Sequence, residues 1–403
     1  PFYYYLITPF YWLGGGNPVW PATALILMNV LAIYLIYKIG QKYFDTFTGL
    51  SAAFLMAISY KLMLSSRWLS NPTPLPLSGA IAMWSLLEIV HGQKQIKWWI
   101  LLGLSLGLSL HFEAASAIFF LPAVVVILFW QKIKPHWTSI ASFVFTLLPQ
   151  IVFDFRNGHI LSKAFYKFLI SEKSFHPVFS SFTNRLLFYK EILTDKFVFD
   201  QWLVIVLILL IVVIFRKKII NKAFIVFMIW CVTPFVTLLF YYGNNGYIWD
   251  YYFTGIYPFS ILLVAIILAQ KKTIALLVMF LVFWQNAPRI KSYLMHERGI
   301  ALKTSLAAVD WVYQDATGKN FNVDVYVPPV IPHAYDYLFL WRGKTKWQRQ
   351  PATDSQPLLY TIHEQDPYHP QFLQNWQARQ DGIAKIDTQV MFGDIGVQKR
   401  WRK

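Results

Sequence analysis

Arg67 and Asn71 stand in the segment SSRWLSNPTPLP, residues 65–76, between two apolar stretches. A guanidinium offers a planar fork of donors that matches two oxygens of a phosphate. Arg67 is therefore a candidate contact for a lipid phosphate, with Asn71 beside it as a polar contact to the substrate. The alternative is an interfacial anchor, in which the charged head of Arg67 reaches the lipid headgroups.

Two further segments carry side chains that suit a sugar. LHFEAAS, residues 110–116, places His111 and Glu113 on a short connection, where two titratable groups can orient a sugar or share a proton. NGYIWDYYF, residues 245–253, places Asp250 and Tyr251 among aromatic rings, which stack on sugar faces while a carboxylate binds hydroxyls. The alternatives are a solvated rim for the first segment and an aromatic belt at the membrane surface for the second.

Asp154 and Arg156 in FDFRNGH, residues 153–159, form the last candidate pair. Side chains two residues apart point to the same side only when the chain is extended. The alternative is an ion pair at a helix end, which contributes little at a surface. A long segment, 154–197, follows without an early return to apolar sequence, and long loops tend to be functional. This favours a role at the site for both residues.

The elements that position these residues are membrane helices. The chain has 403 residues, 56% hydrophobic and only 14% charged, with a mean hydropathy of +0.43, which excludes a single water-soluble domain. A span needs roughly 20 apolar residues. Ten candidate spans follow from apolar runs: 22–39, 47–64, 74–90, 97–111, 114–130, 137–153, 198–215, 223–242, 252–269 and 273–287.

The net charge of +16 is explained by topology rather than by nucleic acid. Five alternating short loops, at 38–46, 91–97, 131–136, 216–222 and 270–272, together carry twelve Lys and Arg, whereas the opposite short loops carry only Arg67. Basic loops face the cytoplasm. The charge distribution therefore predicts that the candidate site, the 154–197 segment and the C-terminal tail lie outside a plasma membrane.

From about residue 288 the composition changes, with 15 basic and 11 acidic residues and no further span. LKTSLAAVDWVYQDATG predicts a helix that ends at Gly318, and NVDVYVPP, YDYLFLW and PLLYTIHE predict strands. The sequence thus predicts three parts: 1–21, the remnant of an outer loop; 22–287, a polytopic transmembrane helical bundle; and 288–403, a small exocytoplasmic α/β domain.

Other chemistries lack their signatures. GLSLGLSL, residues 103–110, offers small residues for close helix packing rather than a phosphate loop, because no GK[ST] follows. The histidines lack ligand spacing, so no metal site is predicted. No cofactor is evident, and a divalent metal stays open.

The order of the segments beginning PFYYYLITPFYWLGGGNPVWP, then SRWLSNPTPLP, then LLPQIVFDFRNGH, resembles the GT-C integral-membrane glycosyltransferases. These include the protein mannosyltransferases of glycosyltransferase family 39 and the aminoarabinose transferases that modify lipid A. The resemblance covers about residues 1–287, and the tail resembles the outer domain of some members.

The resemblance implies inverting transfer of a hexosyl or pentosyl group from a polyprenyl-phosphate donor to a lipid, glycan or protein acceptor in the cell envelope. It implies that a basic residue offsets the donor phosphate, with Arg67 first, Arg156 second and Lys61 third. It also implies a general base on a first outer loop upstream of Pro1, so the sequence is expected to be a fragment of a protein with eleven or more spans. The rival interpretation is a transporter or flippase of a lipid-linked saccharide, which should show polar residues near mid-membrane and two related halves.

Overall fold

The computed structural model describes residues 2–171, 183–189, 221–241, 248–295, 299–328 and 332–403. The chain divides into two compact units: residues 1–14 with 18–292, and residues 15–17 with 293–403. The predicted span at 198–215, and residues 172–182 and 190–197 of the 154–197 segment, lie outside the described residues.

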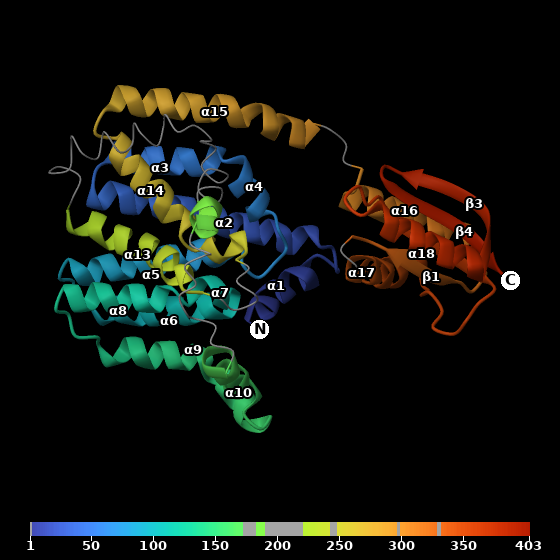
Figure 1. Cartoon of the computed structure of the whole chain (residues 1–403), viewed down its shortest axis with the longest axis horizontal. Coiled ribbons are helices and arrows are strands. Elements are labelled where there is room, and N and C mark those ends of the chain that lie inside the picture. Colours follow the sequence, from blue (N-terminus) through green and yellow to red (C-terminus); the bar gives the residue numbers. More distant parts are fainter. Residues whose placement is uncertain (1, 172–182, 190–220, 242–247, 296–298, 329–331) are drawn as a thin grey trace. The chain divides into compact units, whose positions relative to one another are not determined.

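The first unit is helical (Figure 1). Its N-terminal part consists of α1 (Phe2–Leu13), α2 (Val19–Tyr43), α3 (Thr46–Ile58), α4 (Tyr60–Ser66) and α5 (Leu75–Val90). The segment expected to be an outer loop, 1–21, thus contains helix α1 and the start of α2. The predicted span 47–64 is two helices, because α3 and α4 meet at a bend of 71°. Asp45 begins α3 by accepting the Thr48 N–H at 2.8 Å, as an N-cap residue does.

Helices α6 (Ile96–Phe112) and α9 (Trp137–Arg156) pack along each other, as Figure 1 shows. A Cβ atom at Gly103 would collide with Ser139, and one at Gly107 would collide with Thr146. Without a hydrophobic driving force in lipid, such close approach of backbones is a main source of helix association. The prediction of close packing from GLSLGLSL is confirmed.

The other described elements of the first unit are α7 (Ala114–Ala117), α8 (Phe120–Trp130), α10 (Ile160–Tyr166) with a π-helical turn at Lys167–Ser171, a helical segment at 183–189, α13 (Lys222–Leu239), a 3-10 turn at Asp250–Phe253, α14 (Tyr257–Leu268) and α15 (Lys272–Met295). Among the described residues, α2, α9, α13 and α15 are long and apolar enough to cross a membrane, and α3 with α4 adds a fifth candidate if the bent pair is one span. α5, α6, α7 with α8, and α14 are shorter apolar helices. Each of these overlaps a predicted span, although α15 continues to Met295, past the end predicted at residue 287.

The second unit is an α/β domain with a four-stranded sheet in the order β1-β2-β4-β3. Its elements are α16 (Leu302–Asp315), β1 (Asn322–Tyr326), α17 (His333–Arg342) with a π-helical turn at Gly343–Trp347, β2 (Leu358–Glu364), α18 (Pro370–Ile383), β3 (Ala384–Phe392) and β4 (Ile395–Arg402). β1 pairs with β2 in parallel, and β4 pairs with β2 and β3 antiparallel.

The strand prediction for YDYLFLW is wrong, because this segment forms helix α17. Tyr335, Leu338 and Phe339 are its buried residues, at the i, i+3, i+4 spacing of one helix face. They pack in an apolar core with residues of α16, β2 and β4. A short aromatic run fits a strand or a buried helix equally well, and the fold decided between them.

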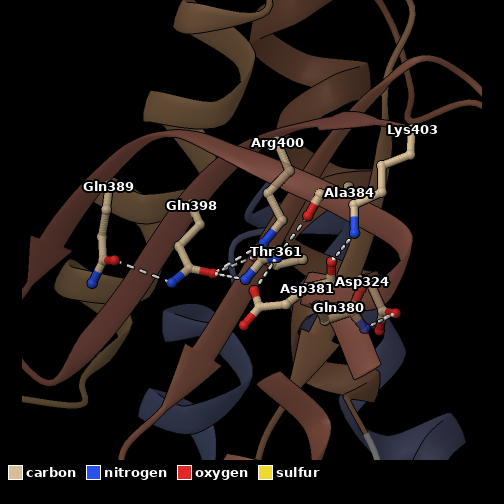
Figure 2. Close-up of polar contacts among 9 residues, drawn as sticks. All are labelled: Asp324, Thr361, Gln380, Asp381, Ala384, Gln389, Gln398, Arg400 and Lys403. Atoms are coloured by element: carbon tan, nitrogen blue, oxygen red, sulfur yellow. Dashed lines mark hydrogen bonds and ion pairs between the residues drawn. The ribbon is translucent and has the colours of Figure 1, made fainter. Parts of the chain in front are cut away.

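Alternate strand residues form a polar cluster around Arg400, which is fully buried (Figure 2). Its guanidinium donates to Thr361 Oγ1 and to Gln398 Oε1, both on the sheet. It also donates to Asp381 Oδ1 at the end of α18 and to the Ala384 carbonyl. The sheet therefore has one apolar and one largely polar interior face, and hydrogen bonding compensates for the buried charge.

Candidate active site

A cavity of about 270 Å³ opens in the first unit where five elements converge. Its walls come from α2, α3, α4, the segment 68–76 and the 3-10 turn with the start of α14. Most of the lining side chains are apolar, among them Ile26, Val30, Ile33, Met56, Leu62 and Met63. The polar lining residues include Asn29, Ser65, Ser66, Thr73 and Asp250. The cavity can therefore take an apolar chain together with a polar group.

Arg67 comes directly after α4 and is exposed. Its neighbours on both sides, Ser66 and Trp68, line the cavity, but Arg67 itself does not. The backbone N–H of Arg67 donates to the Leu64 carbonyl at 3.2 Å, so the helix end holds its main chain in place. Arg67 therefore stands between two residues that line the cavity without being part of the lining itself.

Asn71 and Glu113 are brought together across 42 residues. The Asn71 amide donates to Glu113 Oε2 at 2.8 Å and to the Phe112 carbonyl at 2.7 Å. Glu113 also accepts the Ala115 N–H at 3.2 Å, as the N-cap of α7. Burial raises the pKa of the Glu113 carboxyl, against the opposite effect of these two hydrogen bonds. The pair joins the segment after α4 to the turn between α6 and α7.

The aromatic segment lies at the same cavity. Asp250 and Tyr251 both line it. Burial raises the pKa of the Tyr251 hydroxyl, and the negative charge of Glu113 adds to that effect. The carboxylate of one predicted segment is thus within electrostatic range of the aromatic turn of another. Of the four predicted residues, Asp250 and Tyr251 line the cavity, whereas Asn71 and Glu113 do not.

His111 points elsewhere, although it is two residues from Glu113. Its side chain is 7% exposed, and Nε2 lies 2.6 Å from the Thr146 carbonyl of α9. Its Nδ1 is buried and has no hydrogen-bond partner among the described residues. The ring of Phe2 packs against it at 6.2 Å. The geometry supports a helix-packing role for His111, and a contact of His111 with the sugar stays a prediction.

Asp154 and Arg156, both within the described part of the chain, do not form an ion pair. Asp154 is 7% exposed and accepts the Leu161 N–H at 2.6 Å, the Ser162 N–H at 3.2 Å and the Ser162 hydroxyl. It therefore holds the start of α10 against the end of α9. Arg156 is exposed at the last residue of α9. Neither residue lines the cavity, and their role in the chemistry stays a prediction.

Sequence reasoning missed two asparagines. Asn29, in the middle of α2, lines the cavity, and its amide donates to the Thr73 carbonyl at 3.0 Å. Asn286, in α15, is fully buried and accepts the Tyr60 N–H at 3.0 Å. Both lie within predicted membrane spans, 22–39 and 273–287, which were identified only by their hydrophobicity. A polar side chain within a span is costly in lipid, and that cost was the available signal.

Part of the chain matches a known protein family. Residues 1–153 match the family described as dolichyl-phosphate-mannose-protein mannosyltransferase. No curated protein matches the chain significantly. The matched residues contain α1 to α9 except the last turn of α9, and hence most of the cavity wall. The resemblance to the GT-C membrane glycosyltransferases is confirmed.

Among solved structures, the chain is similar to ArnT from Cupriavidus metallidurans. The crystal structure of ArnT bound to undecaprenyl phosphate matches with a TM-score of 0.60 at 10% sequence identity, covering 99% of this chain and 87% of that chain. The crystal structure of ArnT in the apo state matches with a TM-score of 0.61 at the same identity and the same coverage. The fold, mainly helical with several candidate membrane spans, is similar to that of ArnT.

Proposed function

We propose that this chain is a membrane glycosyltransferase that takes its sugar from a polyprenyl-phosphate donor. The observation that carries the proposal is the apolar cavity, whose lining residues Ser66 and Trp68 stand on either side of Arg67. Ligand pockets of this kind combine apolar walls with a few polar groups that fix orientation. The prenyl chain occupies the apolar part, and Arg67 binds the phosphate. The crystal structure of ArnT with undecaprenyl phosphate supports this choice of donor.

The reaction is transfer with inversion at the anomeric carbon. An acceptor hydroxyl forms a bond to that carbon and gives up its proton to a general base, while the bond to the phosphate oxygen breaks and the electron pair leaves with the polyprenyl phosphate. Arg67 stabilises the negative charge that grows on the phosphate, an effect that is large in a site that excludes water. Asp250 and Tyr251 bind the sugar, and Glu113 fixes the orientation of the Asn71 side chain by accepting a hydrogen bond from its amide.

The site faces outward in this proposal. The predicted outer loops contain Arg67, Glu113 and Asp250, whereas the twelve basic residues of the opposite loops mark the cytoplasmic side. The acceptor is a lipid, glycan or protein outside the plasma membrane, and the second unit, 293–403, lies on that side.

The test is binding of undecaprenyl phosphate to the purified full chain in detergent, measured by native mass spectrometry. We expect Arg67→Ala to weaken binding at least tenfold, because the guanidinium supplies the charge for the phosphate. Arg156→Ala is the matched control, since Arg156 is also an exposed arginine but, unlike Arg67, has no sequence neighbour that lines the cavity. Absence of binding to the wild type would refute the donor assignment. A loss in Arg156→Ala alone would move the phosphate contact to that residue.

A second candidate function is transport of a lipid-linked saccharide. Transporters bind substrate at broken helices, and the bent pair α3 and α4 is one such break beside the cavity. Reconstitution into vesicles separates the two functions. A transferase moves radiolabel from polyprenyl-phosphate sugar to an acceptor, whereas a transporter moves the intact donor across the bilayer without breaking its glycosidic bond.

A further inference from the structure

A buried side-chain amide of helix α15 accepts a hydrogen bond from the backbone at the break between α3 and α4. Asn286 belongs to α15 and is fully buried, and its Oδ1 accepts the N–H of Tyr60, the first residue of α4, at 3.0 Å. Its Nδ2 donates to the Val282 carbonyl of its own helix at 2.8 Å. Both ends of the amide are used, which fixes the orientation of the side chain.

The break itself explains why such an amide is needed. The first N–H groups of any helix have no partner inside that helix. Ser59 caps one of them at α4, because its hydroxyl accepts the Leu62 N–H at 3.3 Å. Asn286 supplies the acceptor for another, from a position 226 residues away. Inside a membrane no water replaces a lost acceptor, so the bend depends on these side chains.

The helix that Asn286 holds forms a wall of the cavity. Leu62, Met63, Ser65 and Ser66 of α4 line it, and Arg67 follows as the C-terminal cap residue of α4. α4 has only seven residues, so its first N–H lies within about two helical turns of Ser66. Asn286 itself does not line the cavity.

We propose that Asn286 is a positioning residue that sets the angle of α4, and through it the places of Ser66 and Arg67 at the donor site. The link to donor binding rests on the proposed function, whereas the link to the geometry of α4 does not. We therefore test the geometry of α4 and the binding of the donor with separate measurements.

The geometric readout is the Ser66→Cys variant, labelled by a membrane-impermeant maleimide. The native Cys231 is buried, so the label reports on the cavity wall. We expect the addition of Asn286→Leu to change the labelling rate at position 66 at least threefold. Ser105→Ala is the control: Ser105 is also buried in a helix, and its hydroxyl donates only to carbonyls of that helix. Equal labelling rates of Ser66→Cys with and without Asn286→Leu would overturn the proposal.

The binding readout is the Kd for undecaprenyl phosphate. We expect Asn286→Leu to raise it about tenfold and Asn286→Asp, which keeps an acceptor oxygen, to raise it less. If Asn286→Leu does not fold, Asn286→Thr replaces it, because a threonine hydroxyl in a helix bonds to its own backbone. A lower Tm with unchanged labelling and Kd would show a merely structural role and overturn the inference. Altered labelling in a protein whose wild type binds no polyprenyl phosphate would refute the proposed function and leave the role in α4 standing.

Discussion

Replacement of Arg400 by methionine tests how the buried charge of the second unit is stabilised. The guanidinium donates to Gln398 Oε1 at 2.6 Å from Nη2 and at 3.1 Å from Nε. It also donates to Thr361 Oγ1 at 3.1 Å, Asp381 Oδ1 at 2.7 Å and the Ala384 carbonyl at 3.2 Å. Figure 2 shows these contacts converging on one side chain. Arg400→Met removes all of them while keeping an unbranched apolar side chain at this position.

Arg400 and Asp381 form an ion pair whose two side chains differ in exposure. This difference sets how much stability each substitution is expected to cost. The side chain of Arg400 is 1% exposed, but that of Asp381 is 60% exposed. Arg400→Met leaves Gln398 Oε1 with the hydroxyl of Thr361 as its remaining donor, and the loss of hydrogen bonds to a buried charged group costs about 3 kcal/mol. Asp381→Asn keeps an acceptor at a solvated position, so we expect a loss of about 0.5 kcal/mol.

The assay is pulse proteolysis of the full chain in detergent across a urea series, with cleavage products of residues 293–403 identified by mass. A fall in the urea midpoint for Arg400→Met, with almost none for Asp381→Asn, is the expected result. Equal losses for the two variants would refute the reasoning, because they would make the single ion pair, rather than the hydrogen-bond network, the source of stability.

Three further predictions follow from the same contacts. Burial favours a higher pKa for Asp310, but hydrogen bonds from Arg342, Trp347 and Lys346 outweigh the effect of burial and lower the pKa from 3.8 to about 2. The stability that the Asp310 carboxylate contributes is therefore present above about pH 4 and lost as the pH falls toward 2. Asp310→Asn should lower the urea midpoint at pH 7 but not at pH 2. Asp154→Ala removes the acceptor for the first N–H groups of α10. Amide hydrogen exchange in residues 160–166 should then become several-fold faster. An unchanged exchange rate would exclude the capping role of Asp154. Ala57→Phe places a ring in the cavity and should abolish undecaprenyl phosphate binding. Ala141→Phe, at an exposed position of α9, should leave that binding intact. Equal effects of the two variants would refute the cavity as the lipid site.

The site residues could be predicted from sequence only as separate segments. Arg67, Asn71, Glu113 and Asp250 were identified because polar side chains stand out beside apolar runs. The contact of Asn71 with Glu113 could not be predicted, because it joins two segments 42 residues apart. Asp154 was predicted to have a role in the chemistry, yet its oxygens accept hydrogen bonds from the start of α10.

The sequence by itself determined the membrane class and the helical stretches, because hydrophobicity along a chain is a local property and a bilayer demands it of every span. It also located the change of composition that separates the second unit. Only the tertiary structure decided the bend at Ser59, where Asn286 supplies an acceptor from the far end of the unit. It also decided the cavity, which arises between helices and belongs to no single segment. Inside a membrane, the packing of helices against one another determines which side chains meet, and the hydrophobicity of a single helix does not predict that packing.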